Sequence, residues 1–376
     1  MNPEFLRIRA EVDLDAVLYN FNELTKERKD LKAFAVLKAD AYGHGAVRLA
    51  RLLRDRAYGF AVATAEEAIE IRDAGLMNPI LILGPVPTES YQDLVRREIR
   101  IALFDAERAK VLSAAAKAVG KSAYVHIKVD TGMSRVGLAP NETGLAELMK
   151  IAAFPNLILE GLFTHFATMD MPDESHALAQ AVRFKGLLNL AEKAGIRFPI
   201  VHLSNSAAVL RKKLFPAETA VRLGIALYGV YPSDDVRYPI PLKPVMSLKS
   251  RITYVKTIPA GTPVSYGETF VSKRPMRIAT ISAGYADGIA RGLSNTGEVL
   301  IRGKRAKILG RVCMDQFMAD VTGIPEAQEE DEVVLLGKQG GEEIRIEELS
   351  AWSGRFPYEY LTCISKRVPR LYVGGQ

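Results

Sequence analysis

The stretch Ala35-Val36-Leu37-Lys38-Ala39-Asp40-Ala41-Tyr42-Gly43-His44-Gly45 decides the fold, because it joins an apolar strand to a helix that begins at Ala46. The strand is predicted over residues 33–38 and ends in a lysine. An ammonium group at the end of a buried strand loses hydration, which lowers its pKa and makes it a candidate amine nucleophile toward carbonyl cofactors. For a single lysine, a packed stem with its head in water is the commoner arrangement.

The same strand-to-helix pattern repeats along the chain. Seven further apolar segments are predicted as strands: 59–63, 80–83, 99–103, 123–129, 159–165, 200–203 and 220–227. Helical patterns lie between them, as at 65–74, 105–119, 142–152 and 175–194. Strict alternation predicts a parallel sheet, and eight such units predict an α/β fold of the (β/α)8 barrel type that closes near Gly229.

The character of the sequence changes near residue 239. Short β-branched runs at 250–255, 277–281, 298–301, 305–308 and 332–336 alternate with glycine-containing turns, which predicts a mostly β domain. We therefore predict a leading strand in residues 1–12 that fits either domain, a barrel over 13–238 and a β domain over 239–376. The length of 376 residues agrees, since a barrel takes about 250.

Composition excludes several classes of protein. The chain is 48% apolar and 25% charged, and its net charge of +6 comes from interspersed basic and acidic residues, so no stripe for nucleic acid is predicted. Two cysteines, Cys313 and Cys363, indicate neither a disulfide framework nor a metal site. Without a signal peptide or an apolar run of about 20 residues, we expect a cytoplasmic protein without a membrane segment.

Polar residues gather where the predicted barrel strands end, and this is the edge at which barrels of this type carry their active sites. In the fifth strand His126, Lys128 and Asp130 alternate with apolar residues, so one face must bring polar groups into the interior. One such group is more often a satisfied structural hydrogen bond. Five polar strand ends together favour a functional site: Lys38, residues 126–135 with Lys128 and Arg135, residues 164–166 with His165, residues 202–206 with His202, Asn205 and Ser206, and residues 221–225 with Arg222.

The loops after the seventh and eighth strands provide a cue for phosphate. Asn205 and Ser206 precede a short helix, and Gly224 and Ile225 follow the last strand. Backbone N–H groups, a hydroxyl and a glycine at these positions can cradle an anion. Taken singly, Ser206 fits a helix N-cap equally well and Gly224 fits a turn.

Two motifs stand out in the predicted β domain. Tyr285 lies in the sequence Gly-Tyr-Ala-Asp-Gly at 284–288, where an aromatic ring is not needed for packing. On its own it fits an exposed turn tyrosine. The second motif, residues 311–316, contains Cys313 and Met314, and we interpret Cys313 as a buried thiol.

Together these strings resemble alanine racemases, which are fold-type III pyridoxal-phosphate enzymes. The similarity extends from residues 11–14 to 365–370, and the Lys38 stretch and the motif at 284–288 are its most specific parts. The resemblance implies a homodimer with composite active sites that interconverts L- and D-alanine. It also implies a supply of D-alanine for peptidoglycan.

The resemblance also implies roles for individual residues. Lys38 would hold pyridoxal phosphate covalently and act as one base, with Tyr285 as the opposite base. Arg222, supported by His165, would face the pyridine nitrogen, and Lys128 matches a lysine that is carbamylated in some members. The remaining implied contacts are Tyr42, Asn205, Ser206, Gly224, Ile225 and Tyr358 for the cofactor, Arg135 for its phenolic oxygen, and Arg135, Met314 and Tyr285 for the amino-acid substrate.

Three alternatives remain open at this point. A broad-specificity amino-acid racemase would share the same machinery, and a fold-type III decarboxylase would share both domains but differ around Lys38 and Tyr285. A non-catalytic pyridoxal-phosphate carrier would need neither a second domain nor an opposing tyrosine. Ser134 and the pair Leu203-Ser204 depart from the common family pattern without altering an implied role.

Overall fold

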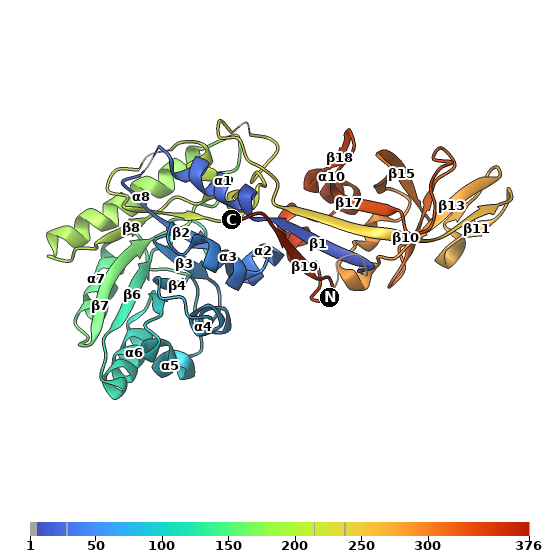
Figure 1. The fold of residues 1–376 in the computed structure, drawn as a ribbon. Helices are drawn as coiled ribbons and strands as arrows, with labels where there is room; N and C mark the ends of the chain where they lie inside the picture. Colours follow the sequence, from blue (N-terminus) through green and yellow to red (C-terminus); the bar gives the residue numbers. More distant parts are fainter. Residues whose placement is uncertain (1–5, 28, 214, 237, 376) are drawn as a thin grey trace. The chain divides into compact units, whose positions relative to one another are not determined.

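The computed structural model describes residues 6–27, 29–213, 215–236 and 238–375, so residues 1–5, 28, 214, 237 and 376 of the predicted domains lie outside it. The chain divides into two compact units (Figure 1). The first, which we name the barrel unit, comprises Leu18–Ala41 and Gly45–Lys243. The second, the β unit, comprises Met1–Val17, Tyr42–His44 and Pro244–Gln376.

Eight parallel strands form the centre of the barrel unit, as predicted. They are β2 (Lys32–Val36), β3 (Gly59–Val62), β4 (Ile80–Ile82), β5 (Arg100–Leu103), β6 (Ala123–Lys128), β7 (Leu157–Phe163), β8 (Ile200–His202) and β9 (Ala220–Leu223). Their spatial order follows the chain from β2 to β8, and β9 pairs with β2. Backbone hydrogen bonds from Thr219 N to Val201 O (2.9 Å) and from Arg222 N to Ser204 O (3.0 Å) link β9 to the β8 side, so the sheet closes into a barrel.

Helices connect the strands, and the four predicted at 65–74, 105–119, 142–152 and 175–194 begin and end within one residue of those bounds. They are α1 (Leu14–Thr25), α3 (Ala46–Leu53), α4 (Ala65–Asp73), α5 (Tyr91–Arg96), α6 (Ala106–Val119), α7 (Glu142–Ala152), α8 (Ser175–Lys193) and α9 (Ser206–Leu210). Local sequence explains their limits. A capping box of Thr64 and Glu67 starts α4, and the Asp105 side chain caps α6, which ends at Gly120 with a left-handed φ of 72°.

Three predicted strand ends were wrong, and one of them is that of β7, which ends at Phe163 instead of residue 165. The first strand ends at Val36, two residues before Lys38. The last ends at Leu223 instead of residue 227, because Gly224 turns the chain and Ile225–Tyr228 form a 3₁₀ helix, η3. The apolar side chains of η3 are buried like those of a strand, so burial alone cannot distinguish the two in the sequence.

The segment after Lys38 is a left-handed helical turn, α2 (Lys38–Gly43). Ala39, Asp40, Ala41 and Tyr42 have φ values of 52° to 54°, which costs about 1–2 kcal/mol for each residue with a Cβ atom. Hydrogen bonds hold the turn, from Ala39 N to Glu67 Oε1 (2.6 Å) and from Ala46 N to Asp40 Oδ1 (2.7 Å). Backbone strain therefore lies directly beside the candidate nucleophile, where strained conformations are typically functional.

The β unit contains a nine-stranded sheet in the order β18-β17-β14-β15-β16-β13-β10-β1-β19. Its strands are β1 (Ile8–Asp13), β10 (Met246–Ile258), β13 (Met276–Ile281), β14 (Glu298–Ile301), β15 (Lys304–Leu309), β16 (Phe317–Asp320), β17 (Glu332–Gln339), β18 (Glu342–Ile344) and β19 (Arg370–Val373). The predicted leading strand, β1, pairs with β10 and β19. The unit is thus mostly β, as predicted, with the unpredicted helices α10 (Ile346–Ser353) and α11 (Pro357–Thr362).

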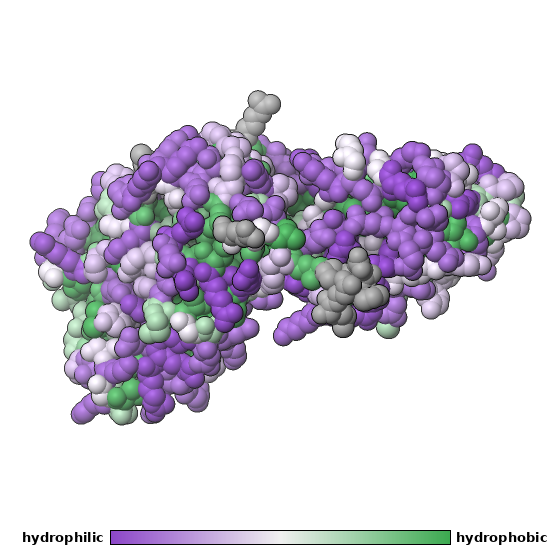
Figure 2. Space-filling view, viewed as in Figure 1, coloured by the Kyte–Doolittle hydropathy of each residue, from purple (hydrophilic) through white to green (hydrophobic). Residues whose placement is uncertain are grey.

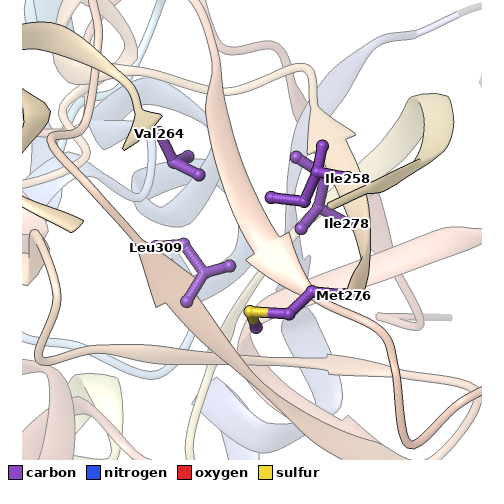
Figure 3. Close-up of a cluster of buried hydrophobic side chains, with 5 residues drawn as sticks. All are labelled: Ile258, Val264, Met276, Ile278 and Leu309. Atoms are coloured by element: carbon purple, nitrogen blue, oxygen red, sulfur yellow. The ribbon is translucent and has the colours of Figure 1, made fainter. Parts of the chain in front are cut away.

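Part of the β unit's core is a compact cluster of aliphatic side chains (Figure 3). Met276 and Ile278 project from one face of β13, since they are two residues apart. They pack with Ile258, Leu309 and Val264, the last from the short strand β11 (Pro263–Val264). This packing supports the end of the sheet next to β11 and the turn that follows it.

Hydrophilic residues cover most of the face shown in Figure 2. Among the described residues, no helix is long and apolar enough to cross a membrane.

The left-handed turn predicts opposite effects of two Ala→Gly changes. Ala39 is exposed, so Ala39→Gly removes the steric cost of its Cβ atom and should raise the free energy of unfolding by about 0.5–1 kcal/mol. Ala114→Gly, at an exposed position of the right-handed helix α6, should lower it by about 0.5–1 kcal/mol. Urea unfolding measures both, and equal losses in the two variants would contradict the strained turn.

Candidate active site

Five groups that can carry positive charge lie at the carboxyl end of the barrel: Lys38, Lys128, Arg135, His165 and Arg222. Burial lowers the pKa of the Lys38 amine, and the nearby charge of Arg135 lowers it further. Burial also holds the pKa of His165 well below its usual range, and Arg222 and Lys128 add to this effect. The sequence placed these residues at separate strand ends, and the structure brings them within electrostatic range of one another.

Lys128 is the most perturbed amine of this group. It is 4% exposed, and its Nζ lies 4.9 Å from the centroid of the Phe163 ring. Burial, together with the charges of Arg222 and Arg135, lowers its pKa to about 6 despite the opposing charge of Asp130. The amine is therefore mostly neutral at pH 7. The polar face of β6 thus points into the barrel, as the alternation predicted.

The Asp130 side chain is hydrogen-bonded within its own loop. Its Oδ1 accepts hydrogen bonds of 3.0 Å from the backbone N–H groups of Gly132, Met133 and Ser134. These bonds outweigh the effect of burial and lower the pKa of its carboxyl group. The carboxylate therefore shapes the segment that leads to Arg135, and it offers limited compensation to the cations.

Arg222 is 3% exposed and bound on several sides. Its guanidinium donates to the carbonyl oxygens of Thr164 (2.8 Å), Leu203 (2.9 Å) and His202 (3.0 Å). Burial lowers the pKa of Arg222 to about 10, against the charge of Glu218, so the group is still a cation at neutral pH.

Two histidines flank this guanidinium. The predicted supporter, His165, has its Nδ1 at 3.4 Å from Nη2, whereas Nδ1 of His202 lies 2.8 Å from Nη1. The sequence analysis placed His202 at a polar strand end but assigned it no role in the site. Alternation along β8 would have placed it on the interior face.

The loops after β8 and β9 meet as the sequence predicted. Ser206 is buried, and its Oγ accepts hydrogen bonds from Gly224 N (2.9 Å) and Ala226 N (3.3 Å). Asn205, rather than Ser206, is the N-cap of α9, since its Oδ1 accepts from Ala208 N (3.2 Å). The Ser206 hydroxyl proton therefore remains available as a donor.

A buried carboxylate that the sequence did not reveal fixes the start of this region. Glu218 accepts from Leu203 N (2.8 Å), Ser204 N (2.6 Å) and Ser204 Oγ (2.8 Å). Burial raises its pKa although these bonds oppose the change. Glu218 thus anchors the strand end from which His202 reaches Arg222.

In the β unit, Tyr42 and Tyr358 lie together although 316 positions separate them, with ring centroids 6.1 Å apart. Tyr42 is buried, which raises the pKa of its hydroxyl. Tyr358 stacks on Phe356 with centroids 4.6 Å apart. Both were predicted to contact the same group, and the β unit brings them to one place.

Tyr285 and Met314 are also neighbours. Tyr285 N donates to Cys313 O and Ala286 N donates to Met314 O, both at 3.0 Å. Gly284 is required at this contact, since a Cβ atom there would lie 2.2 Å from Met314 O. Tyr285 and Met314 are 43% and 52% exposed, respectively. Cys313 is only partly buried, so the interpretation as a buried thiol was wrong.

A buried aspartate, Asp287, stabilises the turn that contains Tyr285. Asp287 Oδ2 accepts from Gly284 N (2.9 Å), and the carboxylate also pairs with Arg7 and with Arg367 (2.9 Å). Because the carboxylate is buried and bound on both sides, the Tyr285 turn has one preferred conformation.

A second tyrosine, which the sequence did not single out, belongs to the same face. Tyr266 is 70% exposed and lines an open pocket with Met314, Cys313 and residues around them. Its neighbours Ser265, Gly267 and Glu268 all have left-handed φ values between 49° and 70°. An exposed aromatic ring in a strained turn indicates a functional role. The strain is evident only from the backbone angles, so the sequence could not reveal it.

Among the described residues, no three His, Cys, Asp or Glu side chains are placed to hold a metal ion.

Comparisons with known proteins identify relatives along nearly the whole chain. The family model of the alanine racemase N-terminal domain matches residues 12–232, and that of the C-terminal domain matches residues 245–372. The chain is 44% identical to alanine racemase of Desulforamulus reducens over 98% of this chain and 99% of that protein. It is 41% identical to alanine racemase 2 of Caldanaerobacter subterraneus over 99% and 96%.

Solved structures are similar over the whole chain as well. Alanine racemase of Clostridium difficile 630 superimposes with a TM-score of 0.93 at 39% identity, covering 98% of this chain and 96% of that one. The Bacillus anthracis alanine racemase with bound L-Ala-P gives 0.91 at 37% identity, covering 99% and 96%. The matched family models together span nearly all of the chain, and this protein belongs to the alanine racemase family.

Proposed function

We propose that the protein is a pyridoxal-phosphate-dependent racemase that interconverts L- and D-alanine with two acid/base groups. The observation that carries the proposal is the perturbed lysine, Lys38, beside Arg135 and Arg222 at the carboxyl end of the barrel. Its family membership and the relatives' names support alanine as the substrate. A broad-specificity amino-acid racemase remains the nearest alternative.

The chemistry of the donor set fits pyridoxal phosphate. The negative charges near Lys128 and Arg222 are already engaged, since Asp130 is bound by its own loop and Glu218 by the loop after β8. A phosphate group and a phenolic oxygen would supply the missing anions, and an aldehyde would react with an amine of lowered pKa. Held in this site, pyridoxal phosphate would supply the electron sink that acidifies the α-proton of an amino acid joined to it, and the Lys38 amine would then be free to act as a base.

The protein's own residues would divide the binding as follows. Ser206 and the backbone at Gly224 and Ile225, next to the capping residue Asn205, would hold the phosphate with Tyr42 and Tyr358. Arg135 would hold the phenolic oxygen, and Arg135, Met314 and a tyrosine of the β unit would contact the substrate. Arg222 would face the pyridine nitrogen. A guanidinium whose pKa is about 10 keeps its proton at neutral pH, so the ring would stay unprotonated.

Racemisation needs acid/base groups on both sides of the α-carbon. Lys38 would serve one side. Tyr285 is the sequence-based proposal for the other, and Tyr266 is a second candidate because it is more exposed and lines the same pocket as Met314. We propose that this tyrosine comes from the partner subunit of a homodimer, so that each active site is composite. We further propose a cytoplasmic location and a supply of D-alanine for peptidoglycan.

Proton exchange in heavy water tests the proposed function. With pyridoxal phosphate and either alanine enantiomer, we expect deuterium at the α-carbon and convergence to a racemic mixture. The variant that lacks the second base, Tyr266→Phe or Tyr285→Phe, should lose at least about a hundredfold in turnover, the usual contribution of general acid/base catalysis. The other variant should keep most turnover if its ring only lines the pocket.

Other outcomes of the same experiment have distinct meanings. Exchange with retained configuration would mean a single working base. Bound cofactor without any exchange would favour a carrier or another substrate, and equal rates with larger amino acids would favour a broad-specificity racemase.

The proposed role of Arg222 predicts how often alanine is converted to pyruvate in a side reaction. An unprotonated ring is a weaker electron sink, which favours return of the proton to the α-carbon over transfer to the cofactor. Arg222→Glu should therefore raise pyruvate formation from alanine at least about tenfold relative to racemisation, a change of about 1.4 kcal/mol in relative barriers. Arg183→Gln, which alters an arginine that donates to Thr131 O outside this cluster, serves as control. No rise in pyruvate would contradict the role of Arg222.

The lowered pKa of Lys128 predicts that its amine reacts with carbon dioxide. Its neutral amine can add CO₂ to give a carbamate and a released proton, and the new anion would lie among Arg135, Arg222 and His165. With ¹³CO₂ we expect one carbamate carbon signal in the NMR spectrum, absent in Lys128→Met. Because the reaction needs the unprotonated amine, the signal should fade as the pH falls below about 6. An unchanged spectrum after addition of ¹³CO₂ would show that Lys128 remains unmodified.

A further inference from the structure

A continuous chain of hydrogen bonds crosses the barrel from Arg222 toward its opposite end. Arg222 Nη1 lies 2.8 Å from His202 Nδ1, and His202 Nε2 lies 2.8 Å from His126 Nδ1. His126 Nε2 lies 3.0 Å from Glu160 Oε2, and Glu160 also accepts from Arg100 Nε (3.1 Å) and Nη2 (3.3 Å). The mechanism above uses only the first member of this chain.

The chemistry of the two ends fixes every proton between them. A guanidinium only donates, so His202 Nδ1 must accept, and a neutral His202 carries its proton on Nε2. That proton is donated to His126 Nδ1, which leaves the His126 proton on Nε2, directed at the Glu160 carboxylate. Burial lowers the pKa of both histidines, which favours these neutral forms. Burial raises the pKa of Glu160, but its bonds from His126 and Arg100 outweigh this, so the carboxyl group stays ionised.

The backbone is shaped to bring Glu160 into this chain. In the pairing of β6 with β7, Val125 is opposite Leu159 and His126 is opposite Gly161, so Glu160 is an extra residue in a bulge. A bulge of this kind re-aims a side chain, and here it lets Glu160 reach His126, whose ring is fully buried. Gly161 makes room for that ring, since a Cβ atom there would lie 2.2 Å from His126 Nδ1.

We propose that Glu160 is a positioning residue for the proposed racemisation: through His126 and His202 it keeps His202 Nδ1 as the acceptor that orients Arg222. The proposal rests on the proposed function of Arg222. Loss of the Glu160 acceptor leaves a buried His126 N–H unsatisfied, and the two histidines can relieve this only by changing tautomer. The alternative tautomer places a His202 Nδ1–H against an Arg222 N–H, which pushes the guanidinium away.

Two variants at Glu160 and one elsewhere separate this role from a general effect of a lost ion pair. Glu160→Leu removes both the charge and the acceptor, whereas Glu160→Gln keeps an acceptor oxygen. The matched control is Glu174→Gln. Glu174 pairs with Arg211 and Lys213 away from the chain, and its side chain is 19% exposed, against 12% for Glu160.

The first measurement is ¹⁵N NMR of the imidazole nitrogens in the holoenzyme, which has only five histidines. In the natural protein and in Glu174→Gln we expect His126 and His202 as neutral rings with the proton on Nε2. Glu160→Leu should change the tautomer of His202. The second measurement is alanine turnover, for which we expect Glu160→Leu to lower kcat at least about tenfold with KM within about twofold, and Glu160→Gln to recover most of the loss.

Each outcome decides the matter. A natural His202 that carries its proton on Nδ1, or a folded Glu160→Leu with unchanged His202 signals and kcat, would overturn the proposal. If Glu160→Leu does not fold, Glu160→Gln together with the tautomers of the natural protein still decides it. The proposal predicts that Glu160→Gln keeps His202 Nδ1 as the acceptor and keeps most of kcat, whereas a Gln variant whose His202 proton moves to Nδ1 without a loss of kcat would remove the link between this chain and Arg222. If the natural enzyme does not racemise alanine, the proposed function fails, while the tautomers still test the chain itself.

Discussion

The burial of positive charge at the carboxyl end of the barrel is the constraint on which the rest of the structure depends. An unpaired charge in a low-dielectric interior is costly, so each cation needs a compensating group. Arg222 finds three backbone carbonyl oxygens and a histidine, whereas Lys128 meets the constraint by losing its proton near pH 6. Lys38 and Arg135 lie close enough for their charges to interact, and this positive region favours the binding of an anionic ligand.

The backbone around this cluster of cations holds its side chains in place. Four consecutive residues after Lys38 adopt left-handed angles, and Glu67 and Asp40 supply the hydrogen bonds that hold the strained turn. On the far side, Glu218 fixes the end of β8, and the bulge in β7 directs Glu160 to His126. Rigid support of this kind is what a site needs when small displacements of a catalytic group reduce the rate.

Much of the fold could be predicted from the sequence, because the signals are local and periodic. The eight barrel strands, the helices between them and the mostly β second domain follow from apolar alternation, caps and glycines at helix ends. The end of the last barrel strand was missed since Ile225–Tyr228 are as apolar as a strand. The left-handed turn was missed because, of the residues in Ala39-Asp40-Ala41-Tyr42, only Asp40 has a side chain that is often found at positive φ.

Only part of the candidate site could be predicted from the sequence. Lys38, Lys128, Arg222 and Ser206 follow from their places at strand ends, but His202, Glu218 and Glu160 act through partners 14 to 76 positions away. Such pairs depend on barrel closure and on a one-residue bulge, neither of which leaves a periodic trace. Tyr266 was missed for the same reason, since its strained turn is visible only in the backbone angles.

Chemical trapping of the cofactor tests the central claim most directly, because the partly buried Lys38 and the buried Lys128 compete for it. The cofactor-free protein would be loaded with pyridoxal phosphate, reduced with borohydride and digested, and the labelled peptide identified by mass spectrometry. The account predicts a stable pyridoxyl group on Lys38 alone, with Lys38→Ala unlabelled at every lysine. A label on Lys128, or on no lysine of the barrel, would contradict it.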